Sequence, residues 1–361
     1  MRRRTFLGGA GAAALSLQWR WVRAGEPASR SLVLAPVRRT PPRPSGLGIL
    51  DLAAETHRAV ETDFVGHSVV GNPARPRRVV LVGQRPGTRS CEIDVEDGAV
   101  TNVFDSATDR QFYGHGAYSE DGSLFYATEN DVKTGAGLVT VRDATTFAVL
   151  GELPTHGVDP HEMRALGDGS TWVICNGGVT TGSVPPERRP SLCYVEEGSG
   201  KLLSRDELAR RDLSIRHLAV TARDDVALAL RADDDQRPST AIALRWRGGP
   251  LAEVTGPPEV TRPGALALSV VIHEGRGVAG FTHPEDGLVT FWDMRERRYL
   301  RSLAVPQAQG ITVTGDGGHF LVSAIDGSLI LVDAERFEPR VLGVRGLDWK
   351  HSLTWRLPRA T

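Results

Sequence analysis

The chain has 361 residues, of which 40% are hydrophobic and 24% are charged, and its formal net charge is −1. This composition is typical of a globular protein with a sizeable core. The near-neutral charge argues against a nucleic-acid binder, because such proteins neutralise phosphates with an excess of basic residues. The three cysteines, Cys91, Cys175 and Cys193, include no CxxC pair. They therefore exclude a disulfide framework and a thiolate zinc knuckle, although Cys175 and Cys193 could pair with each other.

The N-terminus has the pattern of an export signal. Residues 2–7 read Arg-Arg-Arg-Thr-Phe-Leu, and a small apolar run follows at residues 8–17. An arginine pair ahead of such a run indicates a twin-arginine signal peptide. The run is shorter than the roughly 20 apolar residues that a membrane span needs. We expect residues 1–24 to be removed and the mature protein to be periplasmic, with no membrane span.

The rest of the chain reads as short strands of four to eight residues. They are rich in valine, leucine and aromatic residues and are bounded by Gly, Asp or Pro. They form six successive units of four strands, which span residues 68–104, 117–152, 163–203, 218–254, 265–305 and 311–342. Four strands in roughly 45 residues are typical of a β-propeller blade.

Unclaimed strands remain at both ends of the chain. Three precede the first unit, at residues 31–35, 47–52 and 58–62, and one follows the last unit, at residues 351–355. Joining them into a seventh blade satisfies the edge hydrogen bonds of an otherwise open array. We therefore predict a single all-β domain over residues 31–357, a seven-bladed β-propeller whose last blade is closed by the N-terminal and C-terminal strands. The only helix expected is a short surface helix within residues 205–211.

A histidine precedes or begins the inner strand of several units. His67, His115, His161 and His217 follow one another at intervals of 48, 46 and 56 residues, and His351 begins the final strand. The first strands of propeller blades line the central channel in one direction, so these side chains should meet at one mouth of the funnel. They belong to blades one, two, three, four and seven, which are neighbours. The sequence thus predicts a histidine-rich funnel mouth.

The spacing of these histidines is not uniform. His115 lies six residues before the aspartate of the following turn, whereas His161 and His217 lie seven residues before theirs. An offset of one residue turns a side chain to the other face of a strand. Either a bulge absorbs the difference, or Glu162 is the equivalent of His115.

Three interpretations of the mouth are open. Imidazoles and carboxylates together suit a transition metal, for which we expect His115, His161 and His217 as ligands and iron or copper as the ion. Alternatively, the mouth binds an anion through the guanidinium of Arg216, or the histidines only tie blade to blade. The full predicted ligand-binding set is His67, His115, Glu129, Asn130, His156, His161, Glu162, Asn176, Arg216, His217 and His351.

Several phrases carry a family resemblance. They are Tyr-Gly-His-Gly at 113–116, Thr-Glu-Asn-Asp at 128–131, Thr-His-Gly at 155–157 with Pro-His-Glu at 160–162, Asn-Gly-Gly at 176–178, and Leu-Ser-Ile-Arg-His-Leu-Ala at 213–219. From Phe64 to about Leu353 the chain resembles an exported propeller family, domain of unknown function 1513. The resemblance implies a role beside bacterial iron-uptake proteins, with imelysin-like and di-haem-peroxidase-like partners and no established reaction. The tail at 348–351 departs from the family pattern.

These observations favour a monomeric, non-catalytic binding or accessory protein of iron or other metal acquisition. One alternative is a metal-dependent propeller enzyme, lactonase-like or redox-active, in which a histidine or Glu162 acts as the base. Another is a protein-docking scaffold. No Gly-x-Ser-x-Gly motif supports a serine nucleophile.

Overall fold

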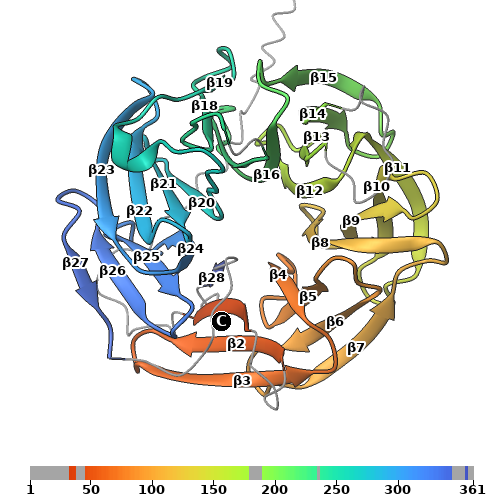
Figure 1. The fold of residues 1–361 in the computed structure, drawn as a ribbon. Helices are drawn as coiled ribbons and strands as arrows, with labels where there is room; N and C mark the ends of the chain where they lie inside the picture. Colours follow the sequence, from red (N-terminus) through yellow and green to blue (C-terminus); the bar gives the residue numbers. More distant parts are fainter. Residues whose placement is uncertain (1–31, 38–44, 179–188, 234–235, 344–353, 357–361) are drawn as a thin grey trace, which may run out of the picture.

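The computed structural model describes residues 32–37, 45–178, 189–233, 236–343 and 354–356. Seven antiparallel sheets of four strands each stand in a ring around a central axis (Figure 1). The prediction of an all-β, seven-bladed propeller is confirmed. The expected signal peptide at residues 1–24 and the candidate ligand His351 lie outside the described residues.

Each blade takes four strands that are consecutive in sequence, except the last. Blade one contains β4 (Gly66–Gly71), β5 (Arg78–Gly83), β6 (Arg89–Asp94) and β7 (Val100–Asp105). Blade two contains β8 (Arg110–Tyr118), β9 (Leu124–Asp131), β10 (Ala136–Asp143) and β11 (Val149–Val158). Blade three contains β12 (Pro160–Ala165), β13 (Thr171–Asn176), β14 (Ser191–Glu196) and β15 (Leu202–Glu207).

The remaining blades continue around the ring. Blade four contains β16 (Leu213–Val220), β17 (Val226–Ala232), β18 (Ile242–Arg245) and β19 (Ala252–Glu253). Blade five contains β20 (Val270–His273), β21 (Val278–His283), β22 (Leu288–Asp293) and β23 (Arg298–Ala304). Blade six contains β24 (Ala308–Val313), β25 (His319–Ala324), β26 (Leu329–Asp333) and β27 (Pro339–Val341).

Blade seven combines both ends of the described chain. Its strands are β28 (Thr354–Arg356), β1 (Leu32–Val37), β2 (Ser45–Asp51) and β3 (Thr56–Thr62), in that order. Strand β28 runs antiparallel to β1, with Thr354 opposite Leu34 and Arg356 opposite Leu32. The C-terminal strand β28 is therefore hydrogen-bonded to the N-terminal strand β1, so both ends of the described chain belong to one sheet.

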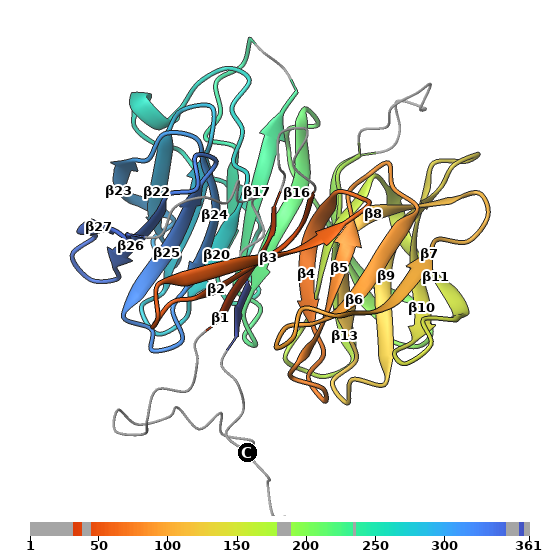
Figure 2. The same ribbon diagram turned by 90° about the horizontal axis from the view of Figure 1, so that it is seen from below.

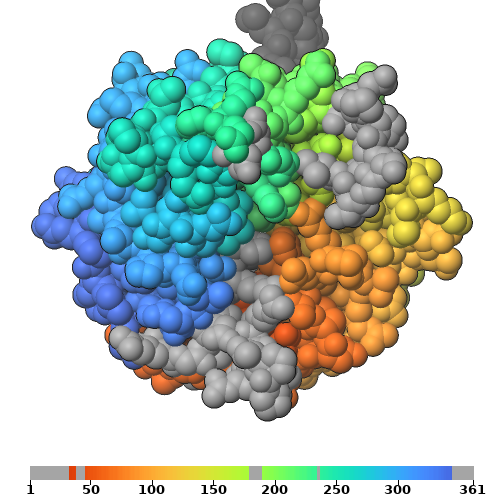
Figure 3. Space-filling view, viewed as in Figure 1, coloured from red at the N-terminus to blue at the C-terminus, as the bar shows by residue number. Residues whose placement is uncertain are grey.

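The core lies between neighbouring blades. Strand β5 reads Val79-Val80-Leu81-Val82, and all four side chains are buried. Because successive side chains of a strand point to opposite faces, Val79 and Leu81 pack with residues of blade seven, whereas Val80 and Val82 pack with residues of blade two. Both faces of the inner strands are covered in this way. In the space-filling view each part of the chain occupies its own sector of the ring (Figure 3).

Seen from the side, inner strands such as β4 and β16 run along the axis of the ring (Figure 2). The one helix in the described part of the chain is a 3-10 turn at Pro258–Val260. The prediction of a short helix within residues 205–211 is wrong, because Leu202–Glu207 pairs with β14 as the outer strand of its blade. No helix among the residues described is both long and apolar enough to cross a membrane.

The three cysteines are buried and free. Strands β13 and β14 place Cys175 opposite Leu192 and Cys193 opposite Ile174. Directly opposed residues share a face of the sheet, so Cys175 and Cys193 point to opposite faces. This register explains why the pairing that the sequence left open does not form.

Candidate metal site

The innermost strands of blades one to four share a local irregularity. In β4, β8, β12 and β16 the pairing with the next strand shifts at or directly beside the histidine. In β4, for example, Gly66 is opposite Gly83 and Ser68 is opposite Val82, so His67 is an extra residue. Such β-bulges re-aim side chains and are common beside functional sites.

The bulges differ in length, which resolves the uneven spacing of the histidines. In β8 the pairing jumps from Phe112 to Gly116 while the partner strand advances by only two residues. In β12 it jumps from Pro160 to Met163, again against two residues. The bulge in β8 therefore absorbs the one-residue offset, and His115 reaches the same place as the other histidines. Glu162 is not needed as its equivalent.

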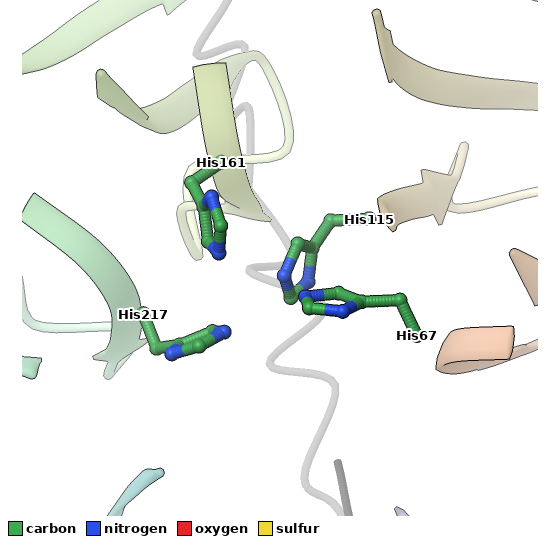
Figure 4. A group of neighbouring side chains, drawn as sticks. All are labelled: His67, His115, His161 and His217. Carbon is green, nitrogen blue, oxygen red and sulfur yellow. The ribbon is translucent and has the colours of Figure 1, made fainter. Parts of the chain in front are cut away.

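Four imidazoles converge on the axis. The ligand atoms of His67, His115, His161 and His217 all lie within 4.8 Å of one another, and all four side chains are buried. Their ring centroids are 4.7 to 6.0 Å apart. Figure 4 shows the rings pointing from four separate strands toward one point. Among the described residues, no other set of three or more His, Cys, Asp or Glu side chains is gathered closely enough to bind a metal.

Burial favours the neutral, metal-binding form of His161. The pKa of His161 is lowered well below 6.5, first by burial and then by the nearby His217, His115 and Arg85. Burial disfavours the imidazolium, and each neighbouring positive charge adds to this effect. The Nδ1 atom of His161 is buried without a hydrogen-bond partner among the described residues. A neutral ring with an unused buried nitrogen is a suitable ligand.

Small residues make room for the rings. Gly114 has a φ of +96°, and a Cβ atom there would lie 2.3 Å from Cδ2 of His67. Two hydroxyl groups hold the bulged strands: Ser68 Oγ donates to the carbonyl of Gly114 at 2.6 Å, and Thr128 Oγ1 donates to the carbonyl of His115 at 3.1 Å. The Gly-His-Gly phrase of the sequence is thus explained by close packing around the site.

The two predicted carboxylates lie outside the histidine group. Glu129 is buried inside blade two, where it accepts hydrogen bonds from Thr140 Oγ1 at 2.6 Å and Arg142 at 2.9 Å. Burial raises its pKa, and Arg142 opposes that shift. Glu162 pairs with Arg164 and accepts the backbone N–H of Leu218 at 3.0 Å, which links blade three to blade four. Both carboxylates therefore have structural partners.

Three further predicted residues also lie outside the histidine group. His156 donates from Nε2 to the carbonyl of Gly200 at 2.8 Å, which ties blade two to blade three. Asn176 donates to the carbonyl of Thr155 at 3.0 Å. Asn130 lies in the second strand of blade two, opposite Gly137, and its Oδ1 atom is buried without a partner among the described residues. None of the three supplies a ligand atom to the histidine group.

Arg216 is the extra residue of the bulge in β16, directly before His217. Its charge interacts with Arg85 and Asp159, two residues that the sequence analysis missed. Asp159 lies directly before the phrase Pro160-His161, and this adjacency was a usable signal. Arg85 lies in the loop between β5 and β6, and nothing in its local sequence marks it.

Comparisons with known proteins agree with this architecture. The profile of a family described as "Protein of unknown function (DUF1513)" matches residues 61–354. The chain belongs to this family. No curated protein matches the chain. Among solved structures, the periplasmic gluconolactonase PpgL of Pseudomonas aeruginosa is similar, with 13% identity, a TM-score of 0.64, and coverage of 91% of this chain and 100% of that chain. At this identity the likeness shows the fold.

Proposed function

We propose that this protein binds a divalent transition-metal ion through His67, His115, His161 and His217. The observation that carries the proposal is the convergence of four buried imidazoles, with ligand atoms within 4.8 Å of one another. Metal–imidazole bonds of about 2.0–2.1 Å place nitrogens across an ion at most about 4.2 Å apart. In a tetrahedral site the same bonds place the nitrogens about 3.3–3.4 Å apart, so each ring needs to move inward by less than about 1 Å in either geometry.

The donor set favours binding over catalysis. Four protein ligands close a site, whereas catalytic metal sites usually keep a position open for water or substrate. Imidazole suits copper, nickel, zinc and iron, and copper has the highest intrinsic affinity for such a site. We therefore propose a binding or accessory protein of metal acquisition. Copper is expected to bind most tightly in solution, and iron is the cargo that the family resemblance implies.

The proposed setting is the periplasm. It is supported by the arginine pair and apolar run at residues 2–17 and by the similar fold of a periplasmic protein. Export by the twin-arginine route delivers folded proteins, so the ion could be loaded before export. The proposed partners are the imelysin-like and di-haem-peroxidase-like proteins that the resemblance implies.

The test is a calorimetric titration of metal-free protein with Cu²⁺, Zn²⁺ and Fe²⁺. We expect one ion per chain and a loss of at least 100-fold in affinity for the double variant His115→Ala/His161→Ala. The matched control is His57→Ala, an exposed histidine of β3, which should bind like the wild type. Circular dichroism checks that the double variant is folded. Failure of the wild type to take up metal, or unchanged affinity in the double variant, would refute the proposal.

A second candidate is a metal-dependent lactonase. The observation that favours it is the fold shared with a periplasmic gluconolactonase. Glu162 is the only predicted base besides the histidines, yet it is paired with Arg164 and bonded to Leu218. This candidate predicts hydrolysis of a sugar lactone by the metal-loaded protein, lost in Glu162→Gln with metal binding intact. Absence of turnover in the loaded wild type would eliminate it.

A further inference from the structure

A group of polar side chains lies next to the four histidines, and we call it the collar. It consists of Arg85, Tyr113, Asp159 and Arg216. These residues come from the β5–β6 loop, strand β8, the connection between β11 and β12, and strand β16. The collar is therefore built by the same four blades that supply the imidazoles.

Arg85 and Asp159 form the fixed half of the collar. Their side chains are ion-paired, and Asp159 is only 2% exposed. The Arg85 guanidinium also lies 5.2 Å from the centroid of the Tyr113 ring. Its positive charge reaches the histidines, because it contributes to the lowered pKa of His161. Arg85 lines a surface pocket of about 370 Å³ formed by residues 64–65 and 83–89, so this part of the collar is accessible from solvent.

Arg216 forms the other half of the collar, and its hydrogen-bonding groups are not all paired. It is half-buried, and its Nε atom is buried with no hydrogen-bond partner among the described residues. Asp159 attracts it, but that carboxylate is already paired with Arg85. Burial and the neighbouring Arg85 both lower the pKa of Arg216. Asp159 is thus shared with Arg85, and Asp233, the other acidic residue near Arg216, pairs with Arg231. The Nε–H group of Arg216 remains without an acceptor among the described residues.

The charge of an ion in the site would sharpen this imbalance. The four imidazoles contribute no negative charge, and the carboxylates of Glu129 and Glu162 are paired elsewhere. Buried positive charge without a counter-charge is costly. A bound anion would supply the missing negative charge. Arginine is well suited to hold it, because its planar fork binds a carboxylate through two parallel hydrogen bonds.

We propose that the collar is an anion subsite, in which Arg216 holds a small carboxylate beside the metal ion. This inference rests on the proposed metal site and specifies its ligand: the metal is bound together with a carboxylate anion. The anion neutralises the excess charge of the ion and of Arg216. Metal and carboxylate should therefore bind cooperatively, since each lowers the electrostatic cost of the other.

The test uses acetate as the probe, because it is a carboxylate that competes weakly for metals. We measure the melting temperature of metal-free and of copper-loaded protein at increasing acetate concentrations. Acetate replaces chloride in the buffer, so that the ionic strength stays constant. A ligand that binds only the folded state stabilises it by RT ln(1 + [L]/Kd), so the rise in melting temperature gives the Kd, which is the concentration at the midpoint of binding. We expect stabilisation by acetate in the wild type, with a midpoint at least tenfold lower when copper is bound.

Arg216→Gln should shift this midpoint at least tenfold upward, while copper affinity without acetate is retained or increased, because a positive charge beside the ion is removed. Arg216→Lys should recover only part of the effect, because lysine keeps the charge but not the fork. The matched control is Arg223→Gln, which removes an exposed arginine from the turn between β16 and β17 and should behave like the wild type.

Two results overturn the subsite: equal acetate midpoints in Arg216→Gln and the wild type, or no stabilisation by acetate in copper-loaded wild type. Failure of the proposed metal site is a different result, in which the wild type binds no copper. In that case the metal-free titration decides the subsite. Acetate stabilisation that Arg216→Gln abolishes supports it, and its absence refutes it.

Discussion

At the scale of single residues, the position of the imidazoles depends on backbone irregularities. His67 is an extra residue in its strand, and His115 and His161 lie within longer shifts of pairing. In a regular strand a one-residue offset would turn a side chain away from its neighbours. The bulges remove this constraint separately in each blade, so unequal spacing in the sequence still leads to one point in space.

Gly114 should be essential to this arrangement. Replacement by alanine would place a methyl group 2.3 Å from Cδ2 of His67, at a φ of +96° that disfavours side chains. We expect Gly114→Ala to lower the free energy of unfolding by about 2 kcal/mol and to weaken metal binding at least tenfold. Urea unfolding and the calorimetric titration measure the two effects.

Gly151→Ala is the matched control, since a Cβ atom there meets nothing within 4 Å. It should change the unfolding free energy by no more than about 0.5–1 kcal/mol and leave metal affinity unaltered. Equal behaviour of the two alanine variants would contradict the packing role of Gly114.

At the scale of elements, a β-bulge in the innermost strand occurs in more blades than a histidine at that position does. Blade six has a comparable shift of pairing between Ala308 and Ile311, but it carries Gln309 and Gly310 there. The inner strand of blade five, β20, pairs with β21 without a shift. The histidines therefore come from four neighbouring blades, on one side of the ring.

Blade two contains a buried ion pair, Glu129–Arg142, whose loss should lower stability without affecting metal binding. Glu129→Gln keeps the shape of the side chain but leaves Arg142, with its side chain 2% exposed, without its counter-charge. Breaking such a pair costs about 3–5 kcal/mol. We expect this loss in urea unfolding, with metal affinity unchanged in the folded protein because Glu129 is not among the four ligands.

The control is Lys133→Met, which removes an exposed ion pair with Asp109. Exposed pairs contribute at most about 1 kcal/mol. If Glu129→Gln abolished metal binding while the protein stayed folded, the assignment of Glu129 to the blade interior alone would be incorrect.

At the scale of the whole molecule, the two ends of the described chain meet in blade seven. Strand β28 pairs with β1 over Leu32, Val33 and Leu34. Without β28, the inner edge of β1 would present unpaired backbone groups to the channel. The blade also packs against blade one, since Leu34 shares a core cluster with Val69 and Leu81.

Deletion of residues 354–361 should therefore destabilise the whole ring. With about 1 kcal/mol for each ladder hydrogen bond that is lost, we expect a decrease of roughly 2–3 kcal/mol, or several degrees in melting temperature. Deletion of residues 357–361 alone, which spares β28, is the control and should melt like the full chain. Equal melting of both truncated proteins would show that the pairing of β28 adds no stability.

The sequence by itself determined the blade count, the order of strands and the presence of a histidine in each of four inner strands. These features are local, because strand length, turn residues and a repeat of roughly 45 residues are written along the chain. It also pointed to the imidazoles that the structure brings together, since the topology of a propeller brings equivalent positions together at the axis.

The tertiary structure decided which side chains belong to the site. Glu129, Glu162, His156 and Asn176 occupy motifs as prominent as those of the histidines, yet their partners lie elsewhere in the fold. Arg85 reaches the site from a loop of another blade. Side-chain direction depends on bulges and on contacts between blades that are distant in sequence, and a repeat pattern does not encode either. Four imidazoles gathered at the axis, with an arginine beside them, are a property of the closed ring.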